Sequence, residues 1–278
     1  MSNELILKLK PYISEKIWGW EKWVLSCHED GKATIEEGIY KGQELSHVLG
    51  CGSNFPILNK IIKAEDNLSV QVHPNDEYAR RVEHSNGKTE CWYILEAKEG
   101  ATLISGIKKG LNKEKLSLII KEDKLDDYLE RISIKRGDFI YIPAGTVHAI
   151  EAGIKLIEVQ QSSNITYRLH DWGRGRELHI EKSLDVIDYE GKNNGGKIDN
   201  FSKLETPYFK VEKIIVNNNY VDKVVENFHS YIVISGEGVI KANNMQMKLK
   251  EEETIYISKG VEYILKGNME LIKASVKN

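Results

Sequence analysis

The stretch that decides the fold is GDFIYIPAGTVH, residues 137–148. An apolar, strand-like run is followed by Pro143 and Gly145, two residue types that shape tight turns. His148 comes just beyond the turn. The order predicts a strand, a tight turn and a second strand, with a histidine where that strand begins. Imidazole is a common metal ligand, so His148 is a candidate for one.

A second copy of this pattern lies near the end of the chain. The stretch EETIYISKGVEY, residues 252–263, aligns with residues 137–148 without gaps. Both stretches therefore predict the same strand and turn. Tyr263 takes the place of His148, so only the first copy keeps a metal-ligating residue at its end. We therefore expect the chemistry in the N-terminal part of the chain and a structural role for the second copy.

Most of the chain between and around these copies reads as short strands separated by Gly, Asn and Asp, which is typical of an all-β sandwich or barrel. Two segments favour helix instead. The first covers about 75–86, where Asn75 is a candidate N-cap. The second covers about 111–132, where apolar residues recur at helical intervals. We interpret both as helical insertions in a β scaffold.

Two further candidate ligands lie in the strand-like segment LSVQVH, residues 68–73. Successive side chains of a strand point to opposite faces, so Gln71 and His73 share one face while Val70 and Val72 share the other. Two polar donors therefore point the same way. The other histidines lack such a context and are interpreted as structural or surface residues: His28, His47, His84, His170, His179 and His229.

The spacing G-x5-P-x-G-x2-H before His148 resembles the second motif of the cupins. Cupins are jelly rolls, or double-stranded β-helices, that can hold a metal between their sheets. Their first motif normally has two histidines at i and i+2, followed closely by a glutamate. Here Gln71 replaces the first histidine, and Glu90 comes only after the first expected helix. The expected ligand set is Gln71, His73, Glu90 and His148.

This ligand set carries a single carboxylate charge, so a divalent ion would keep net positive charge and strong Lewis acidity. Zinc suits imidazole and carboxylate ligands best, although related divalent ions stay open. We expect a mainly β fold with two cupin-like jelly-roll domains. Residues 1–190 would form the catalytic metal-binding domain, and residues 207–278 a degenerate second one. The polar, glycine-containing segment 191–206 between them is predicted to be a linker.

Longer stretches of the sequence resemble one particular family. LSVQVHPNDEYA, GKTECWYIL, YIPAGTVHAI and the IWG near the start are similar to type I mannose-6-phosphate isomerases, in their short bacterial form. The likeness spans most of residues 10–180. It implies one zinc per chain, bound by the four ligands named above. It also implies an aldose–ketose isomerase that interconverts mannose 6-phosphate and fructose 6-phosphate through an enediol.

The same resemblance implies further active-site positions. Glu158 and a zinc-bound water are candidate bases, and Lys88 and Arg168 would be electrostatic stabilisers or proton carriers. Lys60 and Ser69 would contact the phosphate. The six positions that the family pattern carries over are Trp18, Lys60, Ser69, Lys88, Glu158 and Arg168. After about residue 190 the resemblance implies only a second cupin-like β domain.

Two alternative functions use the same ligands. Two histidines and a carboxylate also hold iron(II) in many oxygenases. Gln71 disfavours this, because a fourth protein ligand leaves fewer open positions. A non-catalytic cupin that binds a phosphosugar is the other alternative. It is disfavoured because a sensor does not need the proton-transfer groups Glu158, Lys88 and Arg168.

The composition limits the classes of molecule that the chain is expected to bind. The formal charge of -3, with charged residues spread along the chain, leaves no basic stripe for nucleic acid. Three scattered cysteines favour a reducing compartment, and no apolar run reaches the length of a membrane span. We expect a cytoplasmic protein that acts on a small sugar phosphate. In the absence of an extended apolar stripe, we expect a monomer or a weak homodimer.

Overall fold

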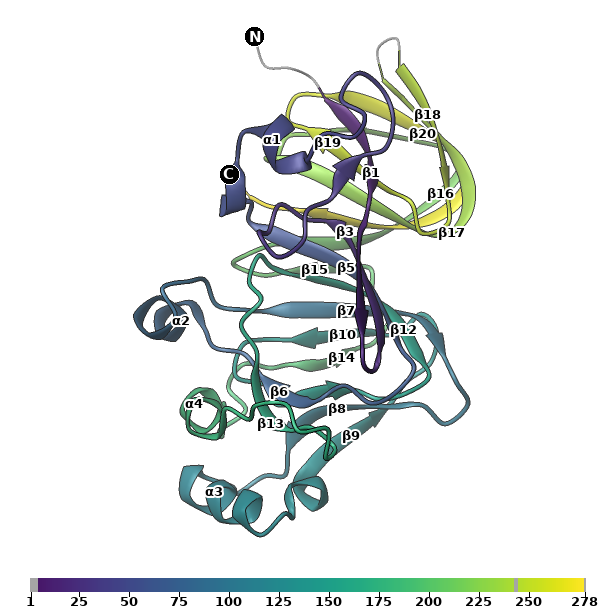
Figure 1. Ribbon diagram of the computed structural model, residues 1–278. Coiled ribbons are helices and arrows are strands. Elements are labelled where there is room, and N and C mark those ends of the chain that lie inside the picture. The colour runs from purple at the N-terminus through teal and green to yellow at the C-terminus, as the bar shows by residue number, and fades with distance from the viewer. Residues whose placement is uncertain (1–4, 243–244, 278) are drawn as a thin grey trace. The chain divides into compact units, whose positions relative to one another are not determined.

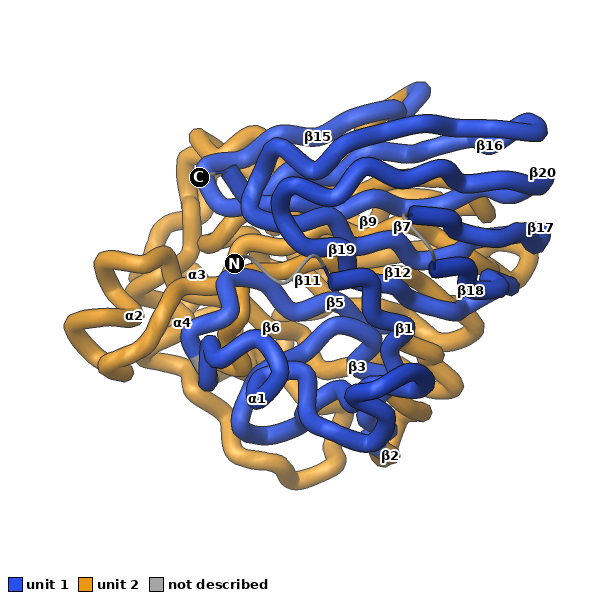
Figure 2. The backbone as a smooth tube through the Cα atoms, turned by 90° about the horizontal axis from the view of Figure 1, so that it is seen from above, with its two compact units in different colours: residues 1–14, 22–61, 200–278 blue, residues 15–21, 62–199 orange. Residues whose placement is uncertain are grey.

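The structure is a computed structural model that describes residues 5–242 and 245–277. The chain divides into two compact units, which Figure 2 shows in different colours. Unit 1 comprises residues 1–14, 22–61 and 200–278, and unit 2 comprises residues 15–21 and 62–199. Both are built mainly from antiparallel strands, so the predicted mainly β fold is confirmed.

Unit 1 is organised around one antiparallel sheet that includes three long strands (Figure 1). The order is β15 (Lys203–Glu205), β16 (Lys210–Lys223), β20 (Glu262–Ser275), β17 (Phe228–Ala242), β19 (Thr254–Ser258), β1 (Ile6–Lys10) and β4 (Thr34–Ile35), with β18 (Met245–Lys250) paired to β17. The short helices α1 (Leu45–Leu49) and η1 (Gly52–Asn54) also belong to this unit. Its apolar core includes Val233, Ile255 and Leu271.

Unit 2 contains a five-stranded sheet and most of a seven-stranded one. The first has the order β13 (Tyr167–His170), β6 (Val70–Val72), β11 (His148–Ile150), β8 (Thr102–Ile107) and β9 (Leu129–Ser133). The second has the order β14 (Gly196–Ile198), β10 (Phe139–Ile142), β7 (Glu90–Ala97), β12 (Ile154–Gln161), β5 (Ile57–Ala64), β3 (Gly19–Leu25) and β2 (Tyr12–Lys16). The unit boundaries fall inside β2, β3 and β5.

The two sheets of unit 2 face each other across an apolar core. Trp92 and Ile140 from the seven-stranded sheet pack in one cluster with Leu103 and Ile150 from the five-stranded sheet. A second cluster covers the other face of the five-stranded sheet, where Val72 packs with Leu116 and Leu184 from helices. Figure 1 shows these helices, α3 (Lys113–Lys121) and α4 (Ile180–Val186), beside the strands, with α2 (Asp76–Val82) nearby.

The first predicted helix is present and begins as the sequence indicates. The Asn75 side chain accepts a hydrogen bond from the backbone N–H of Tyr78, the interaction expected of an N-cap residue. The helix ends at Val82, and residues 83–86 are not helical.

The second helix prediction is wrong beyond its first half. Helix α3 is followed by Asp123 with φ of 55°, a left-handed conformation that interrupts the helix. A short 3-10 turn, η2 (Leu125–Tyr128), comes next, and residues 129–133 form strand β9 paired with β8. Apolar spacing alone missed this change, because Leu125 and Leu129 are buried in the same cluster from different elements.

The grouping of residues also differs from the expected domains. Residues 22–61 belong to unit 1, although the sequence suggested a continuous first domain over 1–190. Strand β1 pairs with β19, so the start of the chain joins a sheet made largely from its end. The segment predicted to be a linker carries two short strands, β14 and β15, and unit 2 gives way to unit 1 between residues 199 and 200. Short edge strands need little apolar periodicity, so the composition did not reveal them.

The predicted internal repeat is confirmed at the level of strand and turn. Residues 139–142 and 254–258 are strands, and each is followed by a turn and a second strand. Gly145 and Gly260, which occupy the same place in the alignment, have φ of 88° and 93°. This left-handed region favours glycine. No helix in the described part of the chain is long and apolar enough to span a membrane.

Candidate metal and active site

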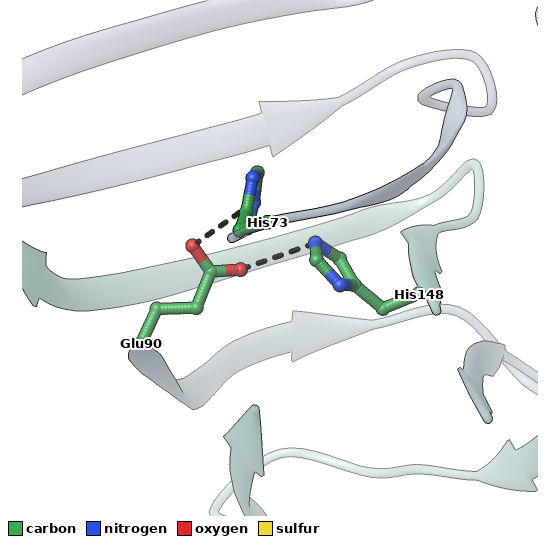
Figure 3. A group of neighbouring side chains, drawn as sticks. All are labelled: His73, Glu90 and His148. Atoms are coloured by element: carbon green, nitrogen blue, oxygen red, sulfur yellow. Dashed lines mark ion pairs between the residues drawn. The ribbon is translucent and has the colours of Figure 1, made fainter. Parts of the chain in front are cut away.

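Three of the four predicted ligands converge in the interior of unit 2. One potential ligand atom from each of His73, Glu90 and His148 lies within 4.8 Å of the others, and all three residues are buried. Figure 3 shows the two imidazole rings at the end of the Glu90 side chain, each facing a different carboxylate oxygen. His73 follows β6, Glu90 begins β7 and His148 begins β11, so the group joins both sheets. We call these three residues the triad.

Hydrogen bonds to the backbone orient both imidazole rings. Nδ1 of His73 lies 2.8 Å from the carbonyl oxygen of Ile165, and Nδ1 of His148 lies 2.9 Å from that of Thr146. A carbonyl oxygen only accepts, so each Nδ1 carries the proton and donates it. The lone pair of a neutral imidazole then resides on Nε2. These Nε2 atoms lie 3.6 Å and 3.3 Å from the two carboxylate oxygens of Glu90.

The donor set fits a divalent metal ion. Burial, the largest influence, lowers the pKa of His148 to about 4, which keeps its imidazole neutral and able to coordinate. Within the described residues, the fully buried Nε2 of His148 has no hydrogen-bond partner. Buried polar atoms are normally hydrogen-bonded, so this atom calls for an explanation, which a bound metal ion would supply. Two imidazoles and a carboxylate are ligands that zinc and related ions use.

A row of directly opposed residues crosses the five-stranded sheet beside the triad. Gln71 pairs with His148 on one side and with Arg168 on the other, and His148 also pairs with Ser105. Directly opposite residues of antiparallel strands place their side chains on the same face. Gln71 therefore shares the face of His148, as the fourth ligand must, and its coordination stays a prediction.

Lys88 is part of the same buried cluster. Its ammonium lies 2.9 Å from a carboxylate oxygen of Glu90 and 3.1 Å from Nε2 of His73. The side chain is almost fully buried, so its charge offsets that of Glu90 in a region of low dielectric. Lys88 therefore lies beside the candidate ligands His73 and Glu90, and its catalytic role stays a prediction.

Glu158 lies one row further along the seven-stranded sheet. It is directly opposite Trp92, and the indole Nε1–H of Trp92 donates a hydrogen bond to its carboxylate at 2.9 Å. The Trp92 ring also meets the ring of His148 edge-on, with 5.4 Å between centroids. Trp92 thus contacts both a triad member and the predicted base.

The other predicted active-site residues are Arg168, Ser69 and Trp18, which belong to unit 2, and Lys60, which belongs to unit 1. Arg168 is partly buried, and burial and the charge of Arg176 lower its pKa from the usual value. Ser69 is buried just before β6, and Trp18 packs in the apolar core of unit 2. Lys60 belongs to unit 1, where its buried ammonium lies 5.0 Å from the centre of the Trp23 ring. The phosphate-binding roles of Lys60 and Ser69 stay predictions.

The sequence interpretation missed three residues that share faces with the site: Ser105, Trp92 and Gln160. Trp92 has the same strand parity as Glu90, and Gln160 the same parity as Glu158, so alternation could have indicated both. Ser105 joins the row only through pairing between β8 and β11, which are distant in sequence. No local signal indicates that pairing.

The mainly β fold and the buried imidazole–carboxylate group together define a candidate metal-binding β-sheet protein, of a kind suited to metal-assisted catalysis. Comparison with known proteins narrows this class to one family. Residues 10–104 match the family model for the catalytic domain of phosphomannose isomerase type I. Mannose-6-phosphate isomerase ManA of Bacillus subtilis is 35% identical over 307 residues, covering 96% of this chain and 97% of the relative.

Solved structures agree with the sequence relatives. A crystal structure of mannose 6-phosphate isomerase from Bacillus subtilis superimposes with a TM-score of 0.89 at 30% identity, covering 98% of this chain and 99% of that one. A zinc-bound mannose 6-phosphate isomerase shares the fold, with a TM-score of 0.78 at 13% identity over 98% of this chain and all of that one. The chain belongs to the type I mannose-6-phosphate isomerase family. Membership supports the isomerase interpretation over the oxygenase and the non-catalytic sensor.

Proposed function

We propose that the chain is a mannose-6-phosphate isomerase that interconverts mannose 6-phosphate and fructose 6-phosphate through an enediol. The observation that carries the proposal is the convergence of the triad, in which both histidines have Nδ1 tied to a backbone carbonyl and Nε2 turned toward Glu90. Gln71, on the same face as His148, would complete the set. One zinc ion per chain suits these ligands best.

Zinc bound there would supply a Lewis acid for the sugar oxygens and for the negative charge that develops on the enediolate. Two of the chain's own groups act at the reacting end of the sugar. Glu158 is the base that moves the proton between C1 and C2, with its carboxylate anchored by Trp92. Lys88 stabilises negative charge at the reacting end of the sugar from its position beside Glu90.

The other predicted residues act at both ends of the substrate. Arg168 lies directly opposite Gln71, so an arginine shares the face of the sheet that carries the predicted ligands. Its guanidinium stabilises charge at the reacting end alongside Lys88. Lys60 and Ser69 bind the phosphate, and Trp18 lines the substrate site. A small anionic sugar is thus the substrate class that these cations match.

The proposal extends to the surroundings of the site. Units 1 and 2 are two cupin-like jelly-roll domains, of which unit 2 is catalytic and unit 1 degenerate. The chain works in the cytoplasm as a monomer or weak homodimer.

A coupled isomerase assay tests the proposed function. Fructose 6-phosphate formed from mannose 6-phosphate is converted to glucose 6-phosphate and then detected by NADPH formation. We expect turnover with saturating zinc, loss of turnover after chelation, and recovery when zinc is returned. Fructose 6-phosphate added directly controls for inhibition of both coupling enzymes by the chelator. Full turnover by the metal-free chain would refute the metal-dependent mechanism. No turnover with zinc would refute mannose 6-phosphate as the substrate.

A further inference from the structure

Gln160 is a buried polar residue next to the triad to which the proposed mechanism gives no role. It lies near the end of β12, directly opposite Glu90 of β7, and its side chain is fully buried. Directly opposite side chains in an antiparallel pair share one face, with Cβ atoms about 5 Å apart. Gln160 therefore lies on the face of the sheet that carries Glu90 and, two residues earlier, Glu158.

The orientation of the Gln160 amide follows from its neighbours. Its side-chain nitrogen, Nε2, lies 2.8 Å from the carbonyl oxygen of Gln161 and 2.6 Å from that of Ser163. Both partners can only accept hydrogen bonds, so the –NH2 group must be on this side. The oxygen Oε1 is consequently turned away from these two carbonyls and cannot exchange places with the nitrogen.

That oxygen has no hydrogen-bond partner within the described ranges 5–242 and 245–277, although it is buried. Buried acceptors are normally satisfied, and a native exception usually marks a functional group or the place of a bound molecule. The next residue provides a contrast. Gln161 has the opposite strand parity, its Oε1 accepts from the backbone N–H of Thr89, and its Nε2 donates to Asp76.

We propose that Oε1 of Gln160 accepts a hydrogen bond from an O–H group held at the metal site, and that Gln160 thereby orients the ligand that the triad binds. The inference rests on the proposed function, and two sources can supply the O–H group. One is a hydroxyl of the sugar phosphate, and the other is a water bound to the metal. Gln160 is neutral, so it adds an acceptor beside Glu90 without adding negative charge to the site.

The test compares Gln160→Met, which keeps the length of the side chain and removes both the Oε1 acceptor and the –NH2 donor, with the matched control Gln161→Met, which also removes one amide acceptor and one amide donor. Zinc affinity of the apo chain is measured by competition with a chromophoric chelator, and kcat and KM are measured for mannose 6-phosphate at saturating zinc. Thermal unfolding monitors the fold of both variants. If a sugar hydroxyl is the donor, Gln160→Met raises KM about tenfold and leaves zinc affinity unchanged.

If a metal-bound water is the donor, Gln160→Met weakens zinc binding by about 10- to 100-fold, as loss of a hydrogen bond to a metal's ligand typically does. The control should change neither quantity by more than about twofold, because Gln161 has the opposite strand parity and its amide bonds only Thr89 and Asp76, neither of which is a candidate ligand. The proposal is overturned if folded Gln160→Met matches the wild type in zinc affinity and in kcat/KM, or if Gln161→Met changes both as much.

A measurement on the wild type covers the case in which Gln160→Met does not fold. A crystal structure with zinc and mannose 6-phosphate should place a sugar or water oxygen within about 3.2 Å of Oε1 of Gln160. The inference is overturned if neither a sugar oxygen nor a water oxygen lies within that distance of Oε1. Failure of the proposed function has a different signature: the wild type would bind zinc but show no turnover, and the zinc and crystallographic measurements would still test Gln160.

Discussion

The two copies of the strand–turn–strand pattern put different chemistry at the same structural position. In unit 2, His148 follows the turn, and its Nε2 faces Glu90 without a hydrogen-bond partner among the described residues. In unit 1, Tyr263 stands at the aligned position, and its hydroxyl lies 2.7 Å from Nδ1 of His229 and 2.6 Å from the hydroxyl of Tyr231. It also donates to Asp222 at 3.2 Å.

The difference shows how a shared scaffold can carry either a site or a closed network. Around Tyr263 in unit 1 the polar side chains pair with one another: Lys273 pairs with Asp222 at 2.7 Å, and Nε2 of His229 lies 2.9 Å from Glu226. In unit 2 the Nδ1–H group of each triad histidine donates a hydrogen bond to a backbone carbonyl. The lone pairs on the two Nε2 atoms are therefore left on the side of Glu90. A metal ion bound by the triad would displace the contacts that the Lys88 ammonium makes with His73 and Glu90, and it would leave the backbone hydrogen bonds of both histidines intact.

The largest expected effect comes from breaking the triad. His148→Ala should lower kcat/KM by about 10³-fold or more, because the metal contributes several kcal/mol of transition-state stabilisation. Bound zinc, measured by elemental analysis after dialysis, should fall from one per chain to none. Activity near the wild-type level in this variant would remove His148 from the ligand set.

Much of this site could be predicted from the sequence because its signals are local. Strand parity placed Gln71 and His73 on one face, and the turn before His148 has the expected form. The assignment of residues 22–61 to unit 1 and the row through Ser105 depend on strand pairing between distant segments. The network around Tyr263 was also hidden, since Tyr263 and its partners lie on three different strands. Periodicity carries no information about such pairings.

Lys88→Met should separate catalysis from metal binding. We expect kcat to fall by about 10²-fold, because a buried charge next to the reacting group is lost. Zinc affinity should stay equal or rise, since the ammonium no longer competes for Nε2 of His73 and the Glu90 carboxylate. Chelator competition measures this affinity. A clear loss of zinc binding would mean that Lys88 supports the ligands instead of competing for them.

Trp92→Phe keeps an aromatic ring against His148 but removes the indole N–H that holds Glu158. Hydrogen bonds to charged groups contribute about 1.5–3 kcal/mol, so a drop in kcat of at least about tenfold is expected, with KM little changed. Steady-state kinetics at saturating zinc measures both. An unchanged kcat would show that Glu158 does not need this anchor.

Tyr263→Phe probes the other side of the comparison. It removes a buried hydroxyl that His229, Tyr231 and Asp222 share, which should cost about 1–3 kcal/mol of unfolding free energy in urea. Isomerase activity and zinc content should stay within about twofold of the wild type. Loss of zinc or activity in a folded Tyr263→Phe chain would contradict a purely structural role for this network.

The smallest effect concerns pH. Burial, followed by the charge of Lys273, lowers the pKa of His229 below its usual value of 6.5. The unfolded chain therefore binds more protons just below pH 6.5, and this group's contribution to stability falls as the pH drops through that range. Urea unfolding at neutral and mildly acidic pH should show a steeper loss for the wild type than for His229→Asn. Equal slopes would show that His229 is not buried in its neutral form.

The most direct test of the central claim is an anomalous-scattering measurement on crystals of the chain grown with zinc. The account predicts one strong peak, about 2.0–2.2 Å from Nε2 of His73, Nε2 of His148 and a carboxylate oxygen of Glu90, with the side-chain oxygen of Gln71 completing the shell. A zinc peak bound elsewhere, with these side chains unligated, would contradict it.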